Sequence, residues 1–408
     1  MYERGINMSH VCLEESINQV NWNFIDSNST YLTHSIHSYP GKFIPQIPRN
    51  LIEIFSKEGD TVCDIFSGSG TTLVEAMLLN RNALGIDASP LACLISRAKT
   101  TCITVGEYES LLELVDYTKT FSQQIMQGSL FNTGPFKSRA SRPDHKGIDF
   151  WFEPFIVEEL AEILSLCKQL TSDSARTIAL TAFSSIVVSV SKQDSDTRYV
   201  RKVKPNITQG SAFRRFGQVL KKNVEACWVF SNTVSTTPKI QVIEANILDH
   251  PEVAPFDLLV CSPPYPNAYS YHLYHASRML WLGMDQPKFK GEEIGSHRKY
   301  SSKGPNKATV ETFKIEMENI FEWIFKYLRD GGRACIVVGN STLSGETINN
   351  ADIIADAARQ HGFIEEYRIT RDLQLNRKAF NPVIGKIKTE NIVILRKNGG
   401  LSDCKIEG

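Results

Sequence analysis

The chain has 408 residues, more than one small domain needs, and this length suggests two or three units. Its 45 lysines and arginines balance 45 aspartates and glutamates, so global charge does not announce a nucleic-acid partner, and attraction to phosphates must come from local clusters. Nine scattered cysteines without a Cys-x-x-Cys pair argue against a zinc knuckle or a disulfide framework and favour a reduced, cytoplasmic compartment.

The N-terminal residues 1–30 are polar and rich in Asn and Ser, which indicates a loosely ordered arm. They lack a basic start followed by an apolar run, so we expect no signal peptide. No stretch of about 18 consecutive apolar residues occurs, so we expect no membrane span. Residues 31–50 contain three prolines and are predicted to form a loop that leads into a helix.

Strand and helix patterns then alternate along the chain. Apolar runs at 61–66 and 83–87 predict buried strands, and helical patterns follow at 71–79 and 90–99. The alternation resumes in the second half of the chain. Further strands are predicted at 240–246, at 256–261, at 334–339, from Glu365 and at 391–396. Repeated strand–helix units imply an α/β fold with a parallel sheet.

A long segment, 105–235, interrupts this alternation. Its apolar residues recur at helical spacing in 157–170, and 178–190 predicts a buried helix. We therefore predict one α/β domain made of 31–104 and 236–398, a mostly helical insertion at 105–235, and a tail at 399–408. A second interruption, 284–312, is basic and polar and contains glycine, so it predicts a mobile loop.

The sequence Asp64-Ile-Phe-Ser-Gly-Ser-Gly-Thr-Thr72 lies between a predicted strand and a predicted helix, where a doubly wound sheet binds a nucleotide-like ligand. Gly68 and Gly70 let the backbone approach such a ligand closely. Neither a P-loop lysine nor the full dinucleotide pattern follows, which favours a ligand with a cation and no phosphate. Asp64 suits an amino group of that ligand, and Asp87 suits its ribose hydroxyls.

The sequence Ser262-Pro263-Pro264-Tyr265 directly follows the predicted strand 256–261. Two prolines fix φ and remove two N–H donors, so rigid acceptors remain. An exocyclic amine of a base is a poor nucleophile because its lone pair is delocalised into the ring. Acceptors that bind both N–H groups, such as the Pro263 carbonyl and the Ser262 side chain, free that lone pair for attack. Tyr265 offers a flat face on which a flipped base can stack.

Together these two turns resemble the S-adenosylmethionine-dependent amino-methyltransferases of DNA. The resemblance implies a Rossmann-like methyltransferase sheet with helices on both faces, S-adenosyl-L-methionine as cofactor, double-stranded DNA as substrate, and a catalytic role for the Ser-Pro-Pro-Tyr turn. Asn246 stands where the family usually carries Asp, and Phe43 of a Pro-Gly-Lys-Phe segment matches the family loosely. The implied cofactor residues are Phe43, Asp64, Phe66, Gly68, Gly70, Thr71, Asp87 and Asn246.

The first residue of the catalytic turn bears on the choice of base. In the family, Asn/Asp-Pro-Pro-Tyr/Phe marks N6-adenine methylation, and Ser-Pro-Pro-Tyr is more typical of cytosine N4 methylation. Ser262 therefore favours a site-specific cytosine-N4 DNA methyltransferase of a restriction-modification or related defence system, with a cognate endonuclease as a candidate partner. An N6-adenine enzyme, an RNA base methyltransferase and a non-catalytic nucleic-acid-binding subunit remain alternatives. We expect no metal, since His272 and His275 have no apparent third ligand.

Basic residues gather in 198–222, a stretch without a carboxylate, with Tyr199, Phe213 and Phe216 interleaved. This pattern favours phosphate contacts and probing of base steps, so the insertion is the predicted target-recognition region. In the family that region usually lies elsewhere, so this prediction depends on charge alone. A second basic group falls within 284–312, and 270–274 is predicted to line the base pocket. The predicted DNA contacts are Arg198, Arg201, Lys202, Lys204, Arg214, Arg215, Arg298 and Lys299.

Overall fold

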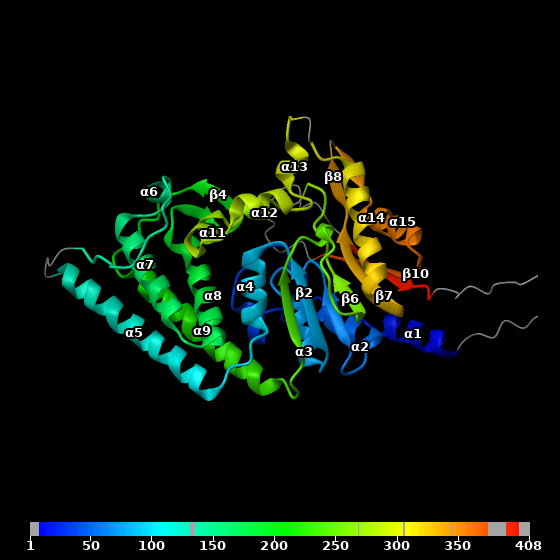
Figure 1. Ribbon diagram of the computed structural model, residues 1–408, viewed down its shortest axis with the longest axis horizontal. Helices are drawn as coiled ribbons and strands as arrows, with labels where there is room; N and C mark the ends of the chain where they lie inside the picture. The colour runs from blue at the N-terminus through cyan, green and yellow to red at the C-terminus, as the bar shows by residue number, and fades with distance from the viewer. Residues whose placement is uncertain are drawn as a thin grey trace, which may run out of the picture.

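The computed structural model describes residues 8–130, 135–267, 269–304, 307–343, 345–373 and 389–399. At its centre is a seven-stranded sheet with the strand order β10-β11-β7-β6-β1-β2-β5 (Figure 1). The strands β1, β2, β5, β6 and β7 are parallel, and β11 is antiparallel to both of its neighbours. The strands are β1 Thr61–Asp64, β2 Asn82–Asp87, β5 Ile240–Glu244, β6 Phe256–Cys261, β7 Leu328–Gly339, β10 Phe363–Asp372 and β11 Thr389–Lys397.

The order of the strands creates a switch point at the middle of the sheet. From β1 the chain moves outward through β2 to β5, and it then returns to the other side of β1 to form β6 and β7. Strands β1 and β6 are therefore adjacent and parallel, with Val62 opposite Leu258. Ligands of open α/β sheets bind at the carboxyl ends of strands beside such a switch point. Both sequence motifs begin there, because one follows β1 and the other follows β6.

Helices cover both faces of the sheet. One face packs against α1 Met8–Gln19, α2 Gln46–Phe55 and α3 Thr71–Leu78, and the other packs against α14 Val310–Tyr327 and α15 Asn350–Gln360. Side chains along β6 alternate between the two cores, as a strand buried on both faces requires. Leu258 and Val260 join the first core, and Leu259 and Cys261 join the second. The predicted α/β architecture, a largely parallel sheet with helices on both faces, is confirmed.

The bounds of individual elements agree with the predicted ones where the local sequence pattern is strong. Helix α4 (Pro90–Lys99) and strand β6 have the predicted bounds. Ser89 caps α4 by accepting a hydrogen bond from Ala92 N, and proline fills the first helical position. Two short 3-10 helices, η1 (Leu32–Ser35) and η2 (Ile247–Asp249), and a small hairpin of β8 (Ser341–Leu343) and β9 (Glu346–Ile348) complete the α/β part.

The prediction of a loose N-terminal arm is wrong for the part of 1–30 that the structure describes. Helix α1 packs with Ile17 3% exposed, and Trp22 is 6% exposed in the same core as α2. The Arg371 guanidinium Nε donates to the Trp22 carbonyl at 2.9 Å, which ties this segment to β10. A few apolar side chains at helical spacing outweigh a polar average. Residues 1–7 and most of the predicted tail, 400–408, lie outside the described residues.

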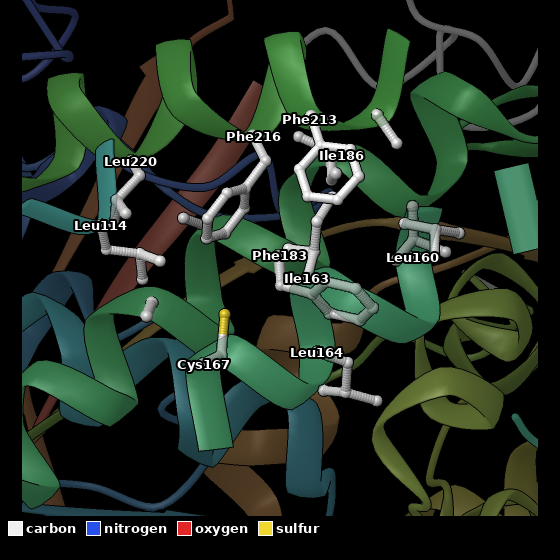
Figure 2. Close-up of a cluster of buried hydrophobic side chains, with 14 of the residues drawn as sticks. Leu114, Leu160, Ile163, Leu164, Cys167, Phe183, Ile186, Phe213, Phe216 and Leu220 are labelled. Atoms are coloured by element: carbon white, nitrogen blue, oxygen red, sulfur yellow. The ribbon is translucent and has the colours of Figure 1, made fainter. Parts of the chain in front are cut away.

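The insertion forms a unit with its own core. Helices α5, α7, α8 and α9 surround a cluster that includes Phe183, Phe213 and Phe216 (Figure 2). The two ends of the insertion meet, since Ile103 N donates to Ser231 Oγ at 2.8 Å. A two-stranded ribbon, β3–β4, was not expected. The elements are α5 Val105–Leu130, α6 Ile148–Trp151, α7 Pro154–Gln169, α8 Asp173–Val190, β3 Gln193–Ser195, β4 Arg198–Arg201 and α9 Ser211–Thr233.

The segment 284–312 contains helices where we predicted a mobile loop. Phe289, Ile294 and Tyr300 are buried, so this basic segment packs on the molecule through a few apolar side chains. The helices of this region are α10 Tyr271–Tyr274, α11 Ala276–Leu282, α12 Gln286–Glu292 and α13 His297–Ser301. Within the described ranges, no helix is long and apolar enough to cross a bilayer.

Candidate active site

A cavity of about 270 Å³ lies at the carboxyl ends of the parallel strands. It is lined by the loop that precedes α2, by the glycine turn after β1, by the residues that follow β2 and β5, and by the Ser-Pro-Pro-Tyr turn after β6. The sequence-predicted residues that it brings together are Phe43, Phe66, Gly68, Thr71, Asp87, Asn246, Ser262, Pro263, Pro264 and Tyr265. Asp64 and Gly70 belong to the same turn but do not line the cavity.

Asp64 holds the glycine turn from behind. Its carboxylate accepts hydrogen bonds from Phe66 N at 3.0 Å and from the Thr72 hydroxyl at 2.7 Å. Burial raises the pKa of Asp64 to about 7. Gly70 has φ +78°, and a Cβ there would lie 3.1 Å from the Cα of Ser96. The glycine therefore lets the turn pack on α4, and Asp64 fixes the shape of the turn.

Asp87 faces the cavity at the end of β2. Its two carboxylate oxygens accept from Gly68 N and from Ser89 N, each at 2.8 Å. Burial raises the pKa of this carboxyl group to about 6. The hydroxyls of Ser67 and Ser69 line the same cavity, are buried, and have no hydrogen-bond partner among the described residues. Unpaired buried hydroxyls beside a carboxylate fit a ligand rich in polar groups, such as a nucleoside with an amino-acid end.

The Ser-Pro-Pro-Tyr turn is held from two sides. The Tyr265 hydroxyl donates to Glu390 at 3.5 Å, and Glu390 in turn accepts from Arg371 at 2.7 Å. Burial raises the pKa of Tyr265 well above its ordinary value, so the phenol stays protonated. On the other side, Gly295 has φ +70°, and a Cβ there would lie 2.5 Å from the Tyr265 carbonyl oxygen. The segment between α12 and α13 therefore packs directly on the Ser-Pro-Pro-Tyr turn.

Stacked aromatic rings line one side of the cavity. The Tyr39 ring stacks on Tyr271 at 5.6 Å between centroids and on His275 at 5.2 Å. Glu293, 4% exposed, lies 2.6 Å from His272 Nδ1 and accepts from Tyr271 N. Both histidines have packing and hydrogen-bonding roles. The described ranges hold no cluster of three His, Cys, Asp or Glu that could bind a metal.

Sequence reasoning identified Tyr271 as a pocket residue but missed Tyr39, Glu293 and Glu390, all of which line the cavity. Tyr39 stands directly before the Pro-Gly-Lys-Phe segment, so its position was a usable signal. Glu390 is brought to the site by the antiparallel pairing of β11 with β7, opposite Gly339. Nothing in the local sequence around Glu390 indicates this placement.

The predicted DNA contacts fall in different environments. Arg198, Arg201 and Lys202 are exposed on or directly after β4, whereas Lys204 and Arg215 donate to the carbonyls of Val188 and Ser189. Arg214 is exposed on α9, Arg298 is exposed on α13, and Lys299 is partly exposed beside it.

The predicted role of Phe213 and Phe216 in probing base steps is wrong, because both rings are fully buried in the insertion core. They belong to a helical stripe that continues through Leu220, Val224 and Cys227 on α9. That 3–4 residue spacing was visible in the sequence and is typical of a core-facing helix.

Several known proteins resemble this chain. Residues 9–97 match the N6_N4_Mtase family model, described as DNA methylase. The type II methyltransferase M.MvaI of Kocuria varians is 29% identical over 278 residues, covering 64% of this chain and 60% of that protein. The type II methyltransferase M.MjaII of Methanocaldococcus jannaschii is 24% identical over 397 residues, covering 77% of this chain and 73% of that protein.

Among solved structures, a methyltransferase from Pyrococcus furiosus is 8% identical and covers 96% of this chain and 98% of its own, with a TM-score of 0.33. A likeness at that score carries no functional information. The family match, the type II relatives and the two motifs that meet at the switch point of the sheet all agree. The chain therefore resembles the S-adenosylmethionine-dependent DNA amino-methyltransferases in the region of the family match and in both motifs.

Proposed function

We propose that this chain is a site-specific DNA methyltransferase that transfers a methyl group from S-adenosyl-L-methionine to the exocyclic N4 amine of cytosine. One observation carries the proposal. The glycine turn after β1 and the Ser-Pro-Pro-Tyr turn after β6 open into the same cavity, on adjacent strands of the sheet. A methyl donor held by the first turn and an amine held by the second would therefore be neighbours.

The cofactor half of the cavity supplies polar groups in the order that such a ligand needs. The Asp87 carboxylate accepts from ribose hydroxyls, and the Asn246 side chain accepts from the adenine amine. Phe43 and Phe66 border the methionine end, and the unpaired hydroxyls of Ser67 and Ser69 offer further hydrogen bonds. When bound, S-adenosyl-L-methionine supplies an electrophilic methyl group on a sulfonium.

The base half of the cavity activates the amine. The Ser262 hydroxyl and the Pro263 carbonyl accept the two N–H groups of the target amine and so stabilise a pyramidal nitrogen with a free lone pair. Tyr265 and the neighbouring aromatic rings hold the flipped base by stacking. Positioning for in-line displacement does most of the work, and no strong base is needed before attack because the methylated nitrogen is acidic.

Product analysis tests the reaction and the base together. The protein is incubated with unmethylated plasmid DNA and methyl-labelled S-adenosyl-L-methionine, and the digested nucleosides are separated by liquid chromatography and mass spectrometry. Labelled N4-methylcytosine is the expected product. N6-methyladenine would transfer the proposal to adenine, labelling of RNA but not DNA would make the chain an RNA enzyme, and no labelling at all would support a non-catalytic subunit.

Separate measurements test the two halves of the cavity. Calorimetry should detect S-adenosyl-L-methionine binding to the wild-type protein, and the proposal fails without it. Ser262→Ala combined with Tyr265→Ala should abolish methyl transfer and leave cofactor affinity unchanged, because both side chains belong to the base half. If the double variant still methylates DNA, the catalytic turn lies elsewhere.

The relatives support a proposal for the biological setting. Several matched proteins are type II methyltransferases, which supports a role in a cytoplasmic restriction-modification system with a cognate endonuclease as partner. Single-molecule sequencing of DNA from cells that express the chain would reveal the methylated base and its sequence context. A modified base at one defined motif is expected, and modification without any motif would contradict site specificity.

A further inference from the structure

One face of the β3–β4 ribbon contacts aromatic rings of α6, and the opposite face is free. Tyr199 packs on the Trp151 ring at 4.6 Å between centroids, and the Arg201 guanidinium lies 5.1 Å from the Phe150 ring centroid. Side chains alternate along a strand, so Arg198 and Val200 point to the opposite side. Val200 is 56% exposed. The free face therefore combines aliphatic and cationic side chains in solvent.

The charge on this face is positive. Arg198 and Lys202 share a single carboxylate, that of Asp194, at 3.0 Å and 3.3 Å. Both cationic side chains are mostly exposed, whereas Asp194 is only 15% exposed. Two exposed cations balanced by one half-hidden carboxylate leave a net attraction for anions. The major groove of DNA admits a two-stranded ribbon, with phosphates along its rims for the cations and thymine methyl groups on its floor for aliphatic side chains.

The turn of the ribbon is fixed to the base side of the active site. Asp196, between the two strands, is paired with Arg278 of α11, which is 1% exposed and also donates to the Ser184 carbonyl at 3.0 Å. Burial alone would raise the pKa of Asp196, but the Arg278 guanidinium and a hydrogen bond from Ser38 hold it below its ordinary value. The carboxylate is therefore charged at neutral pH.

Contacts of Arg278 connect the Asp196–Arg278 pair to the cavity. Arg278 Nη1 lies 3.5 Å from His275 Nδ1, and His275 stacks on Tyr39, which lines the cavity. Gln193 of β3 adds bonds to the Tyr274 carbonyl at 3.4 Å and from the Ser277 hydroxyl at 3.2 Å. Figure 1 shows β4 at the same edge of the molecule as α11 and α12. The ribbon is thus held in a fixed position beside the pocket that receives the base.

We propose that the β3–β4 ribbon enters a groove of duplex DNA through its Arg198, Val200 and Lys202 face, and that the Asp196–Arg278 pair sets its position relative to the base pocket. This inference rests on the proposed function, since it takes DNA as the substrate. It assigns recognition to the ribbon rather than to the helices of the insertion. Asp196 is a positioning residue in this arrangement and does not touch the substrate.

A charge pair tests the groove contact. Arg198→Gln with Lys202→Gln should weaken binding to a 30-base-pair duplex by about tenfold and lower the slope of log K against log salt by about 2. The matched control, Lys221→Gln with Lys222→Gln, removes two exposed cations from α9 of the same insertion and should change neither. Equal effects of the two double variants would overturn the assignment to the ribbon.

Crosslinking tests contact without relying on charge. Val200→Cys labelled with a benzophenone maleimide should crosslink to the duplex. The control Val229→Cys, at a position of α9 that is 52% exposed, should give only the background of labelled wild type, whose exposed Cys102 also reacts. Crosslinking at position 200 no stronger than at 229, in a protein that binds DNA, would overturn the proposal. It would point instead to another partner for this face, such as an acidic protein.

The positioning role has its own readout. Asp196→Asn should lower kcat for duplex methylation by roughly tenfold to a hundredfold, with an unchanged salt slope and unchanged cofactor affinity. Asp196→Glu should restore part of the rate, which separates positioning from a fold defect. A loss of DNA affinity without a change in kcat would overturn this role. If the ribbon crosslinks to DNA but wild type transfers no methyl group, the proposed function fails and the ribbon contact stands.

Discussion

Asp87 lies at the boundary between the glycine turn and the cavity, and its ionisation should control cofactor affinity. Burial raises the pKa of Asp87 to about 6, and only the carboxylate can accept two hydrogen bonds from a ribose. We expect the dissociation constant for S-adenosyl-L-methionine to rise by roughly tenfold per pH unit below about 6, because one proton must leave on binding. Calorimetry between pH 5 and 8 measures this dependence.

The variant Asp87→Asn should bind the cofactor more weakly and should lose the pH dependence. The control Asp249→Asn, in η2 near Asn246 but outside the cavity lining, should keep both the affinity and the pH dependence. If Asp87→Asn retains the acid-side loss of affinity, the titrating group is another one, and Asp64, with its pKa raised to about 7, would be examined next.

Lys99 at the end of α4 is fully buried, and its amino group has no hydrogen-bond partner among the described residues. Burial lowers the pKa of Lys99 well below its ordinary value. The unfolded chain therefore binds more protons than the folded one between that lowered pKa and about 10.4, and stability rises with pH in this window. We expect Lys99→Met to increase the free energy of unfolding at pH 7 by about 1–3 kcal/mol.

Denaturant unfolding at pH 7 and pH 9 checks this expectation. The wild type should gain stability between the two pH values, and the Met variant should show a smaller gain because it lacks the titrating amine. Cofactor affinity should not change, since Lys99 does not line the cavity. A less stable Met variant would show that the ammonium group is solvated or paired in solution.

At the scale of elements, the segment between α12 and α13 supports the Ser-Pro-Pro-Tyr turn. Gly295 has a left-handed conformation, and a Cβ there would lie 2.5 Å from the Tyr265 carbonyl oxygen and 3.0 Å from that of Pro264. Gly295→Ala should displace the turn and lower kcat by roughly a hundredfold, because small misplacements of reacting groups are costly. Steady-state methylation kinetics measure the loss.

A second glycine in α12 provides the control. A Cβ at Gly291 would have no neighbour within 4 Å, so Gly291→Ala should leave kcat unchanged and should slightly stabilise the helix. Normal kcat in Gly295→Ala would mean that the segment yields without moving the turn. A lower kcat in both variants would indicate that the flexibility of the segment matters, not its contact with the turn.

At the scale of the whole molecule, a large buried side chain, Trp281, connects the α/β domain to the core of the insertion. Trp281 of α11 is 2% exposed and packs between Phe152 and Phe183 of the insertion, at 5.7 Å and 6.2 Å between ring centroids. Because the helix that carries Trp281 follows the Ser-Pro-Pro-Tyr turn in the chain, the two units are joined through a buried contact. We expect wild type to unfold in one calorimetric transition.

Trp281→Ala should cost about 3–5 kcal/mol and should separate the melting of the insertion from that of the sheet. Differential scanning calorimetry would then show two peaks. The control Trp228→Ala, within the insertion alone and in tilted contact with the Tyr108 ring, should lower stability without splitting the transition. Two peaks in the wild type would contradict the joint core.

Much of the sheet and of the site follows from local sequence. The short apolar strands end at Asp64 and Cys261, and a turn with glycines or prolines follows each of them. The glycines and prolines determine the shapes of these turns by steric means. The family resemblance paired the two turns, and the structure brings them together because parallel strands present their carboxyl ends on one edge of the sheet. The helices at 90–99 and within 157–190 were predictable because their spacing and caps are local signals.

Other features depend on contacts between distant parts of the chain. Net charge alone does not show which side of α9 faces a partner. Phe213 and Phe216 lie in the core of the insertion, because burial of two aromatic rings is worth more than an attraction to phosphate in solvent. The short ribbon β3–β4 has little local signal. It is held by residues far along the chain, through Asp196 and Arg278.

The sequence by itself determined the two turns and the α/β alternation, because these depend on backbone sterics and on periodicity over a few residues. The cofactor class was implied by the resemblance of the two turns to a methyltransferase family. Tertiary structure alone decided that Tyr39, Glu293 and Glu390 line the cavity and that the N-terminal segment is packed. It also decided that the ribbon β3–β4 is linked through Asp196, Arg278 and His275 to Tyr39 of the cavity lining. Those placements follow from strand order and long-range packing, which no short stretch of sequence encodes.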